Sequence, residues 1–310
     1  MKKITGLIIF ICLSSLSIYS QPDMQKYLND TRVLVKQGKY QEALERHIWF
    51  HEHALEYDKA MLGVRTSFAL SDWKNLGKVY PPALDSLKKT RDRKMEKILT
   101  DQYASIQSSA NDQHIGMLFQ DMTSINRVLE EDSITVQFFQ SLILLNPETA
   151  GKCWIYAKEA LFNEKRFDIL NIYIKSPVNE YREVKNRYLS EVNRDNNIKV
   201  GRESLKTYSE IRFIEKCTQL IQFSLYNNDE KSAKEIHDEA ISIIENDLLR
   251  LALDAELYKQ SGVTFIDLYK KKSMYDEFAK EAAKMQHQID SSISREKEKL
   301  ILITKENSKK

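Results

Sequence analysis

Three histidines and a glutamate crowd one short stretch of the chain, and they are the residues best suited to hold a metal. His47 and His51 are four residues apart, a spacing that can bring two imidazoles to one zinc ion when both lie on a helix. Glu52 and His53 follow directly, but there is no H-E-x-x-H sequence and no obvious third ligand nearby. We therefore expect His47 to pack on an aromatic inner face, with His51 and His53 on faces turned away from one another. The sequence predicts no metal and no cofactor.

Nucleophilic and phosphate-binding chemistry has even less support. There is no G-x-S-x-G elbow, no glycine-rich phosphate loop, and neither Cys153 nor Cys217 has a neighbouring His that would activate a thiol. Acidic pairs such as Glu130–Glu131 are expected to be solvated helix residues. The chain is predicted not to be an enzyme. Because catalytic groups can assemble from distant residues, a helical hydrolase with a site between hairpins remains an alternative.

Charge gives no sign of a nucleic-acid or membrane partner. The chain has 47 Lys and Arg against 45 Asp and Glu, and without Lys2 and Lys3 the two counts are 45 and 45. A neutral chain exerts no net long-range attraction on polyanions. Acidic residues interleave or closely follow the basic clusters 91–94 and 270–272, so we interpret both as solvated faces. We predict no nucleic-acid binding.

The first twenty residues have the pattern of an export signal. Lys2 and Lys3 precede a mostly apolar run, Ile4–Leu16, and residues 17–20 are more polar. The run is shorter than the roughly 20 residues of a membrane span, so a single-span anchor is the weaker interpretation. We expect cleavage after Ser20, no membrane span afterwards, and a periplasmic or secreted protein. Ile11 stands before Cys12 where lipoprotein signals have a small residue, which disfavours a lipid anchor.

The two cysteines that follow the signal are predicted to be buried free thiols. An exported protein can form disulfides. Cys153 and Cys217, however, belong to apolar helical patterns about two hairpins apart, beyond the bridging limit of roughly 7 Å between Cα atoms. Free Cys behaves as a small buried hydrophobe.

Composition predicts an all-α fold. Eight glycines and five prolines make up about 4% of the 310 residues, where average usage is roughly 12%. A chain of this size with many strands would need more turns built from those residues. Apolar periodicity instead predicts helical hairpins. Their helices are Asp23–Gln37 with Gln41–Glu56, Lys59–Leu70 with Asp72–Val79, a long helix Ala83–Ala110, His114–Glu130 with Ser133–Leu145, Lys152–Phe162 with Lys165–Ile174, a helix Glu180–Arg194, Arg202–Tyr226 with Lys231–Glu245, and Leu248–Lys259 with Phe265–Gln288.

Three of the predicted corners can be laid over one another. Gly38-Lys39-Tyr40-x-x-Ala43 aligns with Lys165-Arg166-Phe167-x-x-Leu170 and with Asn228-Asp229-Glu230-x-x-Ala233. Gly38 can adopt the left-handed conformation that ends a helix, and Ala43 is small where a second helix must approach. A unit of about 34 residues with this layout resembles the tetratricopeptide repeat, in degenerate form. The resemblance covers about half of the chain that follows the signal.

One further match to that family misleads the alignment. Trp73-x-x-Leu76-Gly77-x-x-Tyr80 has the family's first-helix signature, but Pro81-Pro82 follows where that helix should continue. We therefore predict that Trp73–Tyr80 belongs to a second helix, with Trp73, Leu76 and Tyr80 packed back on Leu62 and Phe68.

The resemblance implies an α-solenoid of stacked antiparallel hairpins whose first helices line a concave groove for a peptide or a partner helix. The expected organisation is a signal at 1–20, N-terminal hairpins with the long helix at 21–110, C-terminal repeats at 111–290 and a charged tail at 291–310. The function expected by resemblance is that of an exported, non-enzymatic binding or scaffold protein. A substrate-capture protein for sugars or peptides is a further alternative. The residues expected to face the groove are Leu28, Arg32, Met61, Arg65, Lys152, Ile155, Glu159 and Gln222.

Overall fold

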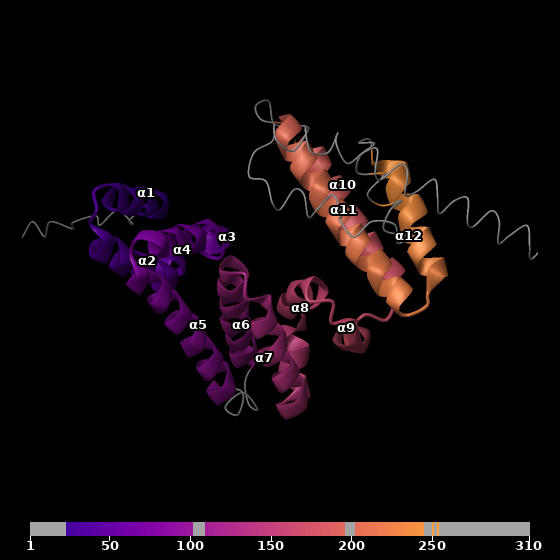
Figure 1. Ribbon diagram of the computed structural model, residues 1–310, viewed down its shortest axis with the longest axis horizontal. Coiled ribbons are helices and arrows are strands. Elements are labelled where there is room, and N and C mark those ends of the chain that lie inside the picture. The colour runs from indigo at the N-terminus through magenta and orange to yellow at the C-terminus, as the bar shows by residue number, and fades with distance from the viewer. Residues whose placement is uncertain (1–22, 102–108, 196–201, 245–249, 251–252, 254–310) are drawn as a thin grey trace, which may run out of the picture. The chain divides into compact units, whose positions relative to one another are not determined.

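A computed structural model describes residues 23–101, 109–195, 202–244, 250 and 253 (Figure 1). The elements it assigns in these ranges are helices, as the composition predicts. They are α1 (Met24–Lys36), α2 (Tyr40–Tyr57), the 3-10 turn η1 (Lys59–Met61), α3 (Leu62–Arg65), α4 (Phe68–Val79), α5 (Pro81–Asp101), α6 (Ser109–Leu129), α7 (Asp132–Leu145), α8 (Pro147–Asn163), α9 (Phe167–Tyr173), α10 (Pro177–Asp195), α11 (Arg202–Tyr226) and α12 (Glu230–Ile243).

The chain divides into two compact units, Met1–Ala160 and Leu161–Lys310, here called unit 1 and unit 2. The sequence predicts a boundary near residue 110 instead. Helices α5 and α6, on either side of that point, pack against one another within unit 1. The predicted signal at 1–20, the pair 248–259 and 265–288, and the tail 291–310 lie outside the described residues, apart from Arg250 and Leu253.

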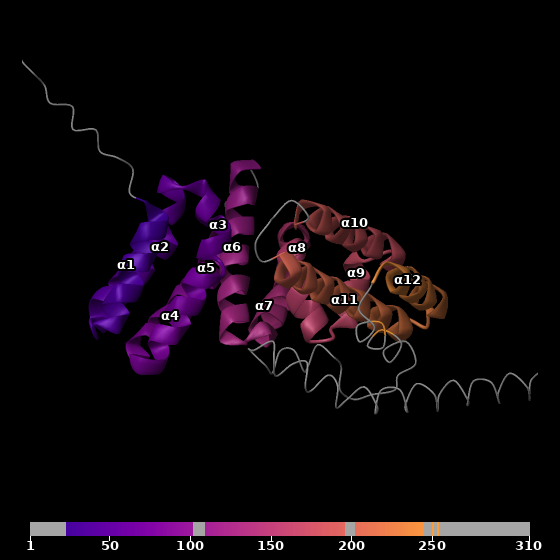
Figure 2. The same cartoon turned by 90° about the horizontal axis from the view of Figure 1, so that it is seen from above.

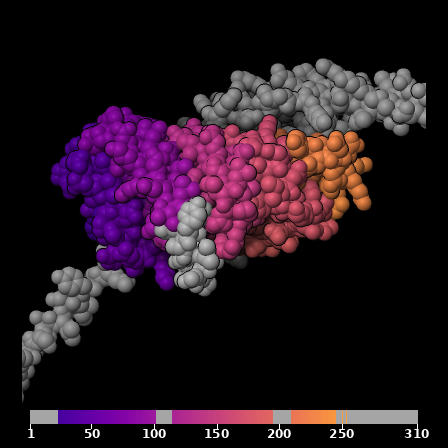
Figure 3. All heavy atoms as spheres, turned by 90° about the horizontal axis from the view of Figure 1, so that it is seen from below, coloured from indigo at the N-terminus to yellow at the C-terminus, as the bar shows by residue number. Residues whose placement is uncertain are grey.

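Helices of unit 1 pack largely in chain order. Helix α2 packs on α1 and α4, and α5 packs on α4 and α6. The first helices of successive hairpins also meet, because α1 packs on α4 and α4 on α6. Figure 2 shows α1, α2, α4, α5 and α6 following one another across the unit, with the α1–α2 hairpin at its end (indigo in Figure 3). Neighbouring helices of unit 1 thus cover one another's apolar faces.

Two apolar clusters hold these hairpins together. Met24 and Leu28 of α1 are buried with Phe50 and Ala54 of α2 and Ala69 of α4. The second cluster joins four helices, α2, α4, α5 and α6. Its buried members are Ala43, Leu44, Leu70, Trp73, Leu76, Ala83, Leu87 and Ile125.

The three aligned corners share one backbone geometry. Gly38, Lys165 and Asn228 have φ of 75°, 52° and 58°. At the first corner the Lys39 amide donates to the Leu34 carbonyl at 3.0 Å and the Gly38 amide to the Val35 carbonyl at 3.1 Å. This is the Schellman pattern of a helix end. The same pair of bonds recurs at the other two corners.

A fourth corner of this kind, between α6 and α7, is not in the sequence alignment. Glu130 has φ of 62°, and the Glu131 amide donates to the Asn126 carbonyl at 2.8 Å. Glutamate at a left-handed position gives no sequence signal, since that conformation favours Gly or Asn. The residue five positions after the left-handed one is fully buried at all four corners: Ala43, Thr135, Leu170 and Ala233.

The prediction for residues 59–80 is wrong in its helix boundaries. A turn at Thr66-Ser67 separates the short α3 from a continuous α4, so no helix runs from Lys59 to Leu70. Trp73 and Leu76 are buried with α2, α5 and α6, whereas Leu62 and Phe68 are 37% and 68% exposed. The sequence misleads because Pro81-Pro82 is read as a stop, although Pro is well tolerated in the first turn of a helix, where α5 has it.

Helix α4 is therefore the first helix of a hairpin whose second helix is α5. A Cβ atom added to Gly77 would lie 2.9 Å from the Leu84 Cβ atom, so α4 and α5 approach closely at this glycine. The Trp73 indole N–H donates to the Ala83 carbonyl at 2.9 Å, which ties the same two helices together.

Unit 2 is built on aromatic packing around α11. Tyr188 of α10 stacks on Phe213 with ring centroids 4.5 Å apart, and Phe167 of α9 meets Phe223 edge-on at 6.0 Å. Helices α10, α11 and α12 all pack against one another. Cys217 lies in this core, and Cys153 lies in that of unit 1. Both are buried free thiols, as predicted, and burial raises the pKa of Cys153 to about 12.

Candidate functional site

Two of the residues predicted to line a groove are buried instead. Leu28 is 1% exposed and belongs to the apolar cluster between α1, α2 and α4. Arg65 is 5% exposed and bonds to Asp121 within unit 1. A helix-period pattern shows that a residue shares a face with others, but it does not reveal whether a neighbouring helix covers that face. These two residues cannot contact a partner at the surface.

The other predicted residues of unit 1 keep some exposure. The Arg32 Nε donates to an Asp72 carboxylate oxygen at 2.8 Å, which links α1 to α4. Lys152 pairs with Glu148 at 2.8 Å, and Ile155 is 61% exposed. Met61 and Glu159 are half-buried. Gln222 is half-buried in unit 2, and its place in a common groove with the others stays a prediction.

Exposed apolar side chains occur on every first helix of unit 1, and also on second helices, where Leu144 of α7 is 79% exposed. Here the first helices are α1, α4, α6 and α8, each followed by the second helix of its hairpin. The exposed residues on the first helices are Val33 (47%), Phe68 (68%), Val79 (56%), Met117 (45%) and Ile155 (61%). Neighbouring first helices touch: α1 and α4 through Arg32 and Asp72, and α6 and α8 where Gly116 faces the Tyr156 ring. Apolar side chains in water are available for contact with a partner.

An ionic cluster, buried at His51, Arg65 and Asp121 and open to solvent at Glu52, joins four helices of unit 1. Both guanidinium nitrogens of Arg65 (α3) donate to the carboxylate of Asp121 (α6), at 2.5 and 2.6 Å. The Arg65 Nε donates to the His51 carbonyl of α2 at 2.6 Å. Lys94 of α5 lies 3.5 Å from Asp121 and 3.3 Å from Glu52. We call these five residues, His51, Glu52, Arg65, Lys94 and Asp121, the ionic cluster.

Burial and pairing act in opposite directions on the acids of this cluster. Burial by itself would raise the pKa of Asp121, but the hydrogen bonds and charge of Arg65 outweigh it and hold the pKa below its usual value. Burial would also raise the pKa of Glu52, but electrostatic interactions with Lys94, His51 and Arg93 and the hydrogen bond from Lys94 together lower it. Asp121 therefore stays ionised and balances the buried Arg65.

His51 is the neutral member of the cluster. Burial first, and then the charge of Arg65, lowers its pKa to about 4, and its Nε2 lies 3.9 Å from an Asp121 oxygen. Neither ring nitrogen has a hydrogen-bond partner among the described residues. With 2% of its surface exposed, His51 cannot reach a substrate in this conformation. The cluster fixes the packing of α2, α3, α5 and α6.

The histidines do not converge on one point. His47 is 3% exposed and stacks on Trp73 at 6.2 Å, as expected for a residue on an aromatic inner face. His51 meets the edge of the same indole, and His53 pairs with Glu56 at 3.0 Å. Within the part of the chain that the structure describes, no group of three His, Cys, Asp or Glu side chains is placed to hold a metal ion.

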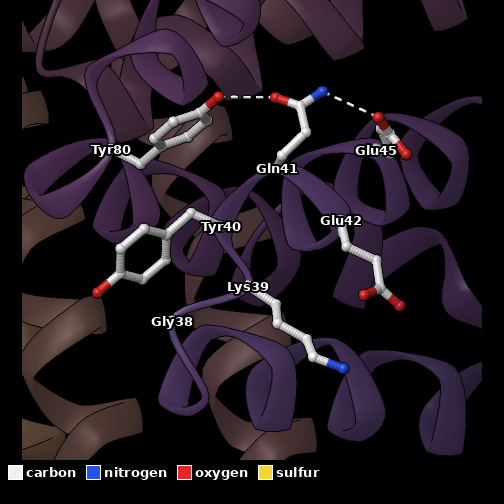
Figure 4. Close-up of a pocket in the computed structure, with 7 residues that line it drawn as sticks. All are labelled: Gly38, Lys39, Tyr40, Gln41, Glu42, Glu45 and Tyr80. Atoms are coloured by element: carbon white, nitrogen blue, oxygen red, sulfur yellow. Dashed lines mark hydrogen bonds between the residues drawn. The ribbon is translucent and has the colours of Figure 1, made fainter.

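A shallow pocket of about 480 Å³ opens at the corner between α1 and α2 (Figure 4). Gln41 lies between Tyr80 and Glu45: its carbonyl accepts from the Tyr80 hydroxyl at 2.7 Å, and its amide donates to Glu45 at 2.9 Å. The Tyr40 and Tyr80 rings stack with centroids 6.1 Å apart. Gly38, Lys39 and Glu42 complete the lining.

Sequence reasoning misses the ionic cluster, although one signal for it exists. Asp121 stands in the largely apolar run from Ile115 to Ile125 of a helix whose residues 121–126 are all buried. A charge in such a run needs a partner of opposite sign. The partner, Arg65, is 56 residues away and could not be identified without the fold.

The chain matches no protein-family model, no curated protein and no solved structure at a significant level. Among the described helices, none has the length and apolar character that a membrane crossing requires.

Proposed function

We propose that this protein is an exported, non-enzymatic binding module, a solenoid of tetratricopeptide-like hairpins that receives a peptide or a partner helix along its first helices. The observation that carries the proposal is the exposed apolar side chain on each of α1, α4, α6 and α8. A partner that covered these side chains would gain the free energy of their burial.

The repeated corners support the architectural part of the proposal. Four hairpins close with a residue in the left-handed conformation and with the same pair of backbone hydrogen bonds. In each, the side chain five residues later is fully buried. In helical-repeat proteins such hairpins stack and build extended binding surfaces. The mixed character of the proposed surface, with the Arg32–Asp72 pair beside apolar residues, suits an internal peptide segment or a mixed helix.

Capture from the organism's own extract tests the binding surface. We compare the tagged chain with a double variant, Phe68→Asp with Ile155→Asp, and with a control double variant, Leu144→Asp with Leu145→Asp, on the second helix α7. Leu144 and Leu145 are 79% and 60% exposed, which matches the changed residues. Charges placed in an apolar interface are costly to desolvate, so we expect the first variant to lose its partner at least tenfold and the control to retain it. Equal recovery by the two variants would place the interface elsewhere.

Export is tested by the N-terminus of the protein in the cell. We expect the protein outside the cytoplasm to begin at Gln21. A chain that keeps Met1 and remains in the cytoplasm would contradict this part of the proposal.

A further inference from the structure

Helix α2 carries an aromatic row on the side that faces away from α4. Trp49, His53 and Tyr57 are spaced four residues apart, and Tyr27 of α1 joins the row. The Trp49 ring lies 4.8 Å from Tyr27, 5.3 Å from His53 and 5.5 Å from Tyr57, centroid to centroid. At 100° per residue, Trp49 and His53 lie about 200° around the helix from His47 and His51, which contact Trp73 of α4.

This row is partly exposed. Tyr57 is 36% exposed, the His53 side chain is 44% exposed, and Trp49 and Tyr27 are half-buried. Tyr27 and Trp49 pack against the apolar cluster between α1, α2 and α4, and within the described part of unit 1 no further hairpin precedes α1–α2 (Figure 2). The end repeats of a helical array usually have a polar outer face, whereas this one is aromatic. Half-buried Trp and Tyr are the residues that most often dominate the binding energy of interfaces.

Acidic residues follow one edge of the row. Glu42, Glu45, Glu52 and Glu56 lie within about 80° of arc on α2, next to the aromatic side chains. All four are exposed. Glu45 and Glu42 also line the corner pocket, so the acidic edge continues from the pocket along the helix (Figure 4).

Few cations offset this edge. Lys94 of α5 lies 3.3 Å from Glu52, and Lys39 lines the pocket with Glu42. The single arginine of α2, Arg46, is turned toward α1: it bonds to the Thr31 hydroxyl and the Tyr27 carbonyl, and its guanidinium lies 3.9 Å from the Tyr27 ring centre. Glu52 is offset by Lys94 and Arg93, and Glu42, Glu45 and Glu56 against Lys39 leave the rest of the edge acidic.

We propose that this face of α2 is a second docking surface and that it takes a basic amphipathic helix of a partner protein. An apolar stripe on that helix would cover Trp49 and Tyr57, and its Lys or Arg residues would lie against Glu42, Glu45 and Glu56. Lysine and arginine are attracted both to carboxylates and to the faces of aromatic rings. The ring centroids of Tyr27, His53 and Tyr57 all lie within 5.5 Å of the Trp49 ring, so the aromatic patch is compact and matches about one turn of the docking helix. The surface is separate from the first-helix face and goes beyond the proposed function.

A titration with defined peptides tests this surface in the full chain. The probe is a 14-residue amphipathic helix of leucine and lysine without tryptophan, and the comparison peptide has glutamate in place of lysine. Binding is measured by calorimetry and by the change in tryptophan emission, to which the half-buried Trp49 contributes. We expect the lysine peptide to bind at least tenfold more tightly than the glutamate peptide, and to weaken as salt is added.

Two sets of substitutions locate the contact. The variant Glu42→Gln, Glu45→Gln, Glu56→Gln should lose at least tenfold in affinity. The control Asp85→Asn, Glu96→Gln, Glu148→Gln removes the same charge from exposed positions elsewhere in unit 1 and should lose less than twofold. Tyr57→Ala tests the aromatic part with little risk to the fold, and we expect a loss of about fivefold. Melting curves confirm that each variant remains folded.

Three results would overturn the proposal. The first is equal affinity of the lysine peptide and the glutamate peptide. The second is an equal loss of affinity in the triple variant Glu42→Gln, Glu45→Gln, Glu56→Gln and in its control. The third is a molecular mass, measured by light scattering, that doubles with concentration in the wild type but not in Tyr57→Ala, because a second copy would then be the occupant. The double variant Phe68→Asp with Ile155→Asp should bind the lysine peptide normally, so this surface and the first-helix surface can fail independently.

Discussion

Both units have apolar and aromatic cores, and unit 1 also contains a buried ion pair. Unit 1 buries a bidentate pair between Arg65 of α3 and Asp121 of α6, two residues that are 56 positions apart in the sequence. The core of unit 2 is rich in rings, with Phe213 between Tyr181 and Tyr188 and with Phe223 between Phe162 and Phe167. An apolar core tolerates small shifts of register, because many packings bury a similar area. A buried charge pair is satisfied only in one arrangement.

This difference predicts how each unit responds to damage. Removal of one charge from unit 1 leaves its partner buried and unpaired, whereas removal of part of a ring from unit 2 leaves a cavity that neighbours can partly fill. The two effects can be followed in the same chain. Trp49, Trp73 and Trp154 are its only tryptophans and all lie in unit 1, so their emission reports that unit, while far-UV ellipticity reports the whole chain.

Asp121→Ala should produce the largest loss. It removes the carboxylate that neutralises Arg65 and Lys94, and we expect the free energy of unfolding of unit 1 to fall by about 3–5 kcal/mol. Urea titrations followed by tryptophan emission measure the change. The double variant Arg65→Met with Asp121→Leu removes both charges and should be less destabilised than Asp121→Ala. If the double variant is less stable than Asp121→Ala, the ion pair stabilises unit 1 by more than the mutual neutralisation of its charges.

Acid should weaken unit 1 through its two buried histidines. Burial lowers the pKa of His47 and His51 to about 4, below the ordinary value of 6.5, so the unfolded chain binds protons that the folded chain does not. Their contribution is complete above pH 6.5 and is lost as the pH falls toward 4. Each histidine should lower the free energy of unfolding by about 2 kcal/mol between pH 7 and pH 5.

A single substitution isolates one of these contributions. In His47→Gln the pH dependence of stability between pH 7 and pH 5 should shrink by about half, measured by urea titrations at a series of pH values. Parallel slopes for wild type and His47→Gln would mean that His47 has the same pKa in the folded and the unfolded chain.

Phe213→Leu should have a smaller effect in unit 2. The change removes the stacked contact with Tyr188 and part of the ring volume, and we expect a loss of about 1–2 kcal/mol. Thermal unfolding followed by ellipticity measures it. We expect Phe213→Leu to lower the free energy of unfolding by less than half as much as Asp121→Ala does. A larger loss in Phe213→Leu would contradict the contrast between the two units.

Local rules account for what the sequence predicts correctly. Helix spacing and scarce glycine and proline predict the all-α class, and the α1–α2, α8–α9 and α11–α12 corners follow from turn chemistry. The rest depends on contacts between distant residues. Nothing near Leu28 or Arg65 shows that a neighbouring helix covers them, and both are wrongly predicted to be exposed. Pro81-Pro82 can end one helix or begin the next, and only the packing of Trp73 against Ala83 decides between the two.

The two units can also be compared at single residues. Gly38 in a hairpin of unit 1 and Lys165 at the α8–α9 corner have the same left-handed backbone conformation. A lysine at positive φ carries a strain of about 1 kcal/mol that glycine avoids. Lys165→Gly should therefore raise the free energy of unfolding by about 0.5 kcal/mol, after the greater entropy of glycine in the unfolded chain is subtracted. Gly38→Ala should lower it by about 1 kcal/mol, although a Cβ atom there would meet nothing within 4 Å. A melting temperature that rises in Lys165→Gly and falls in Gly38→Ala would show that the backbone conformation sets the residue preference at these corners. A stabilised Gly38→Ala would show that the first corner relaxes away from its left-handed geometry.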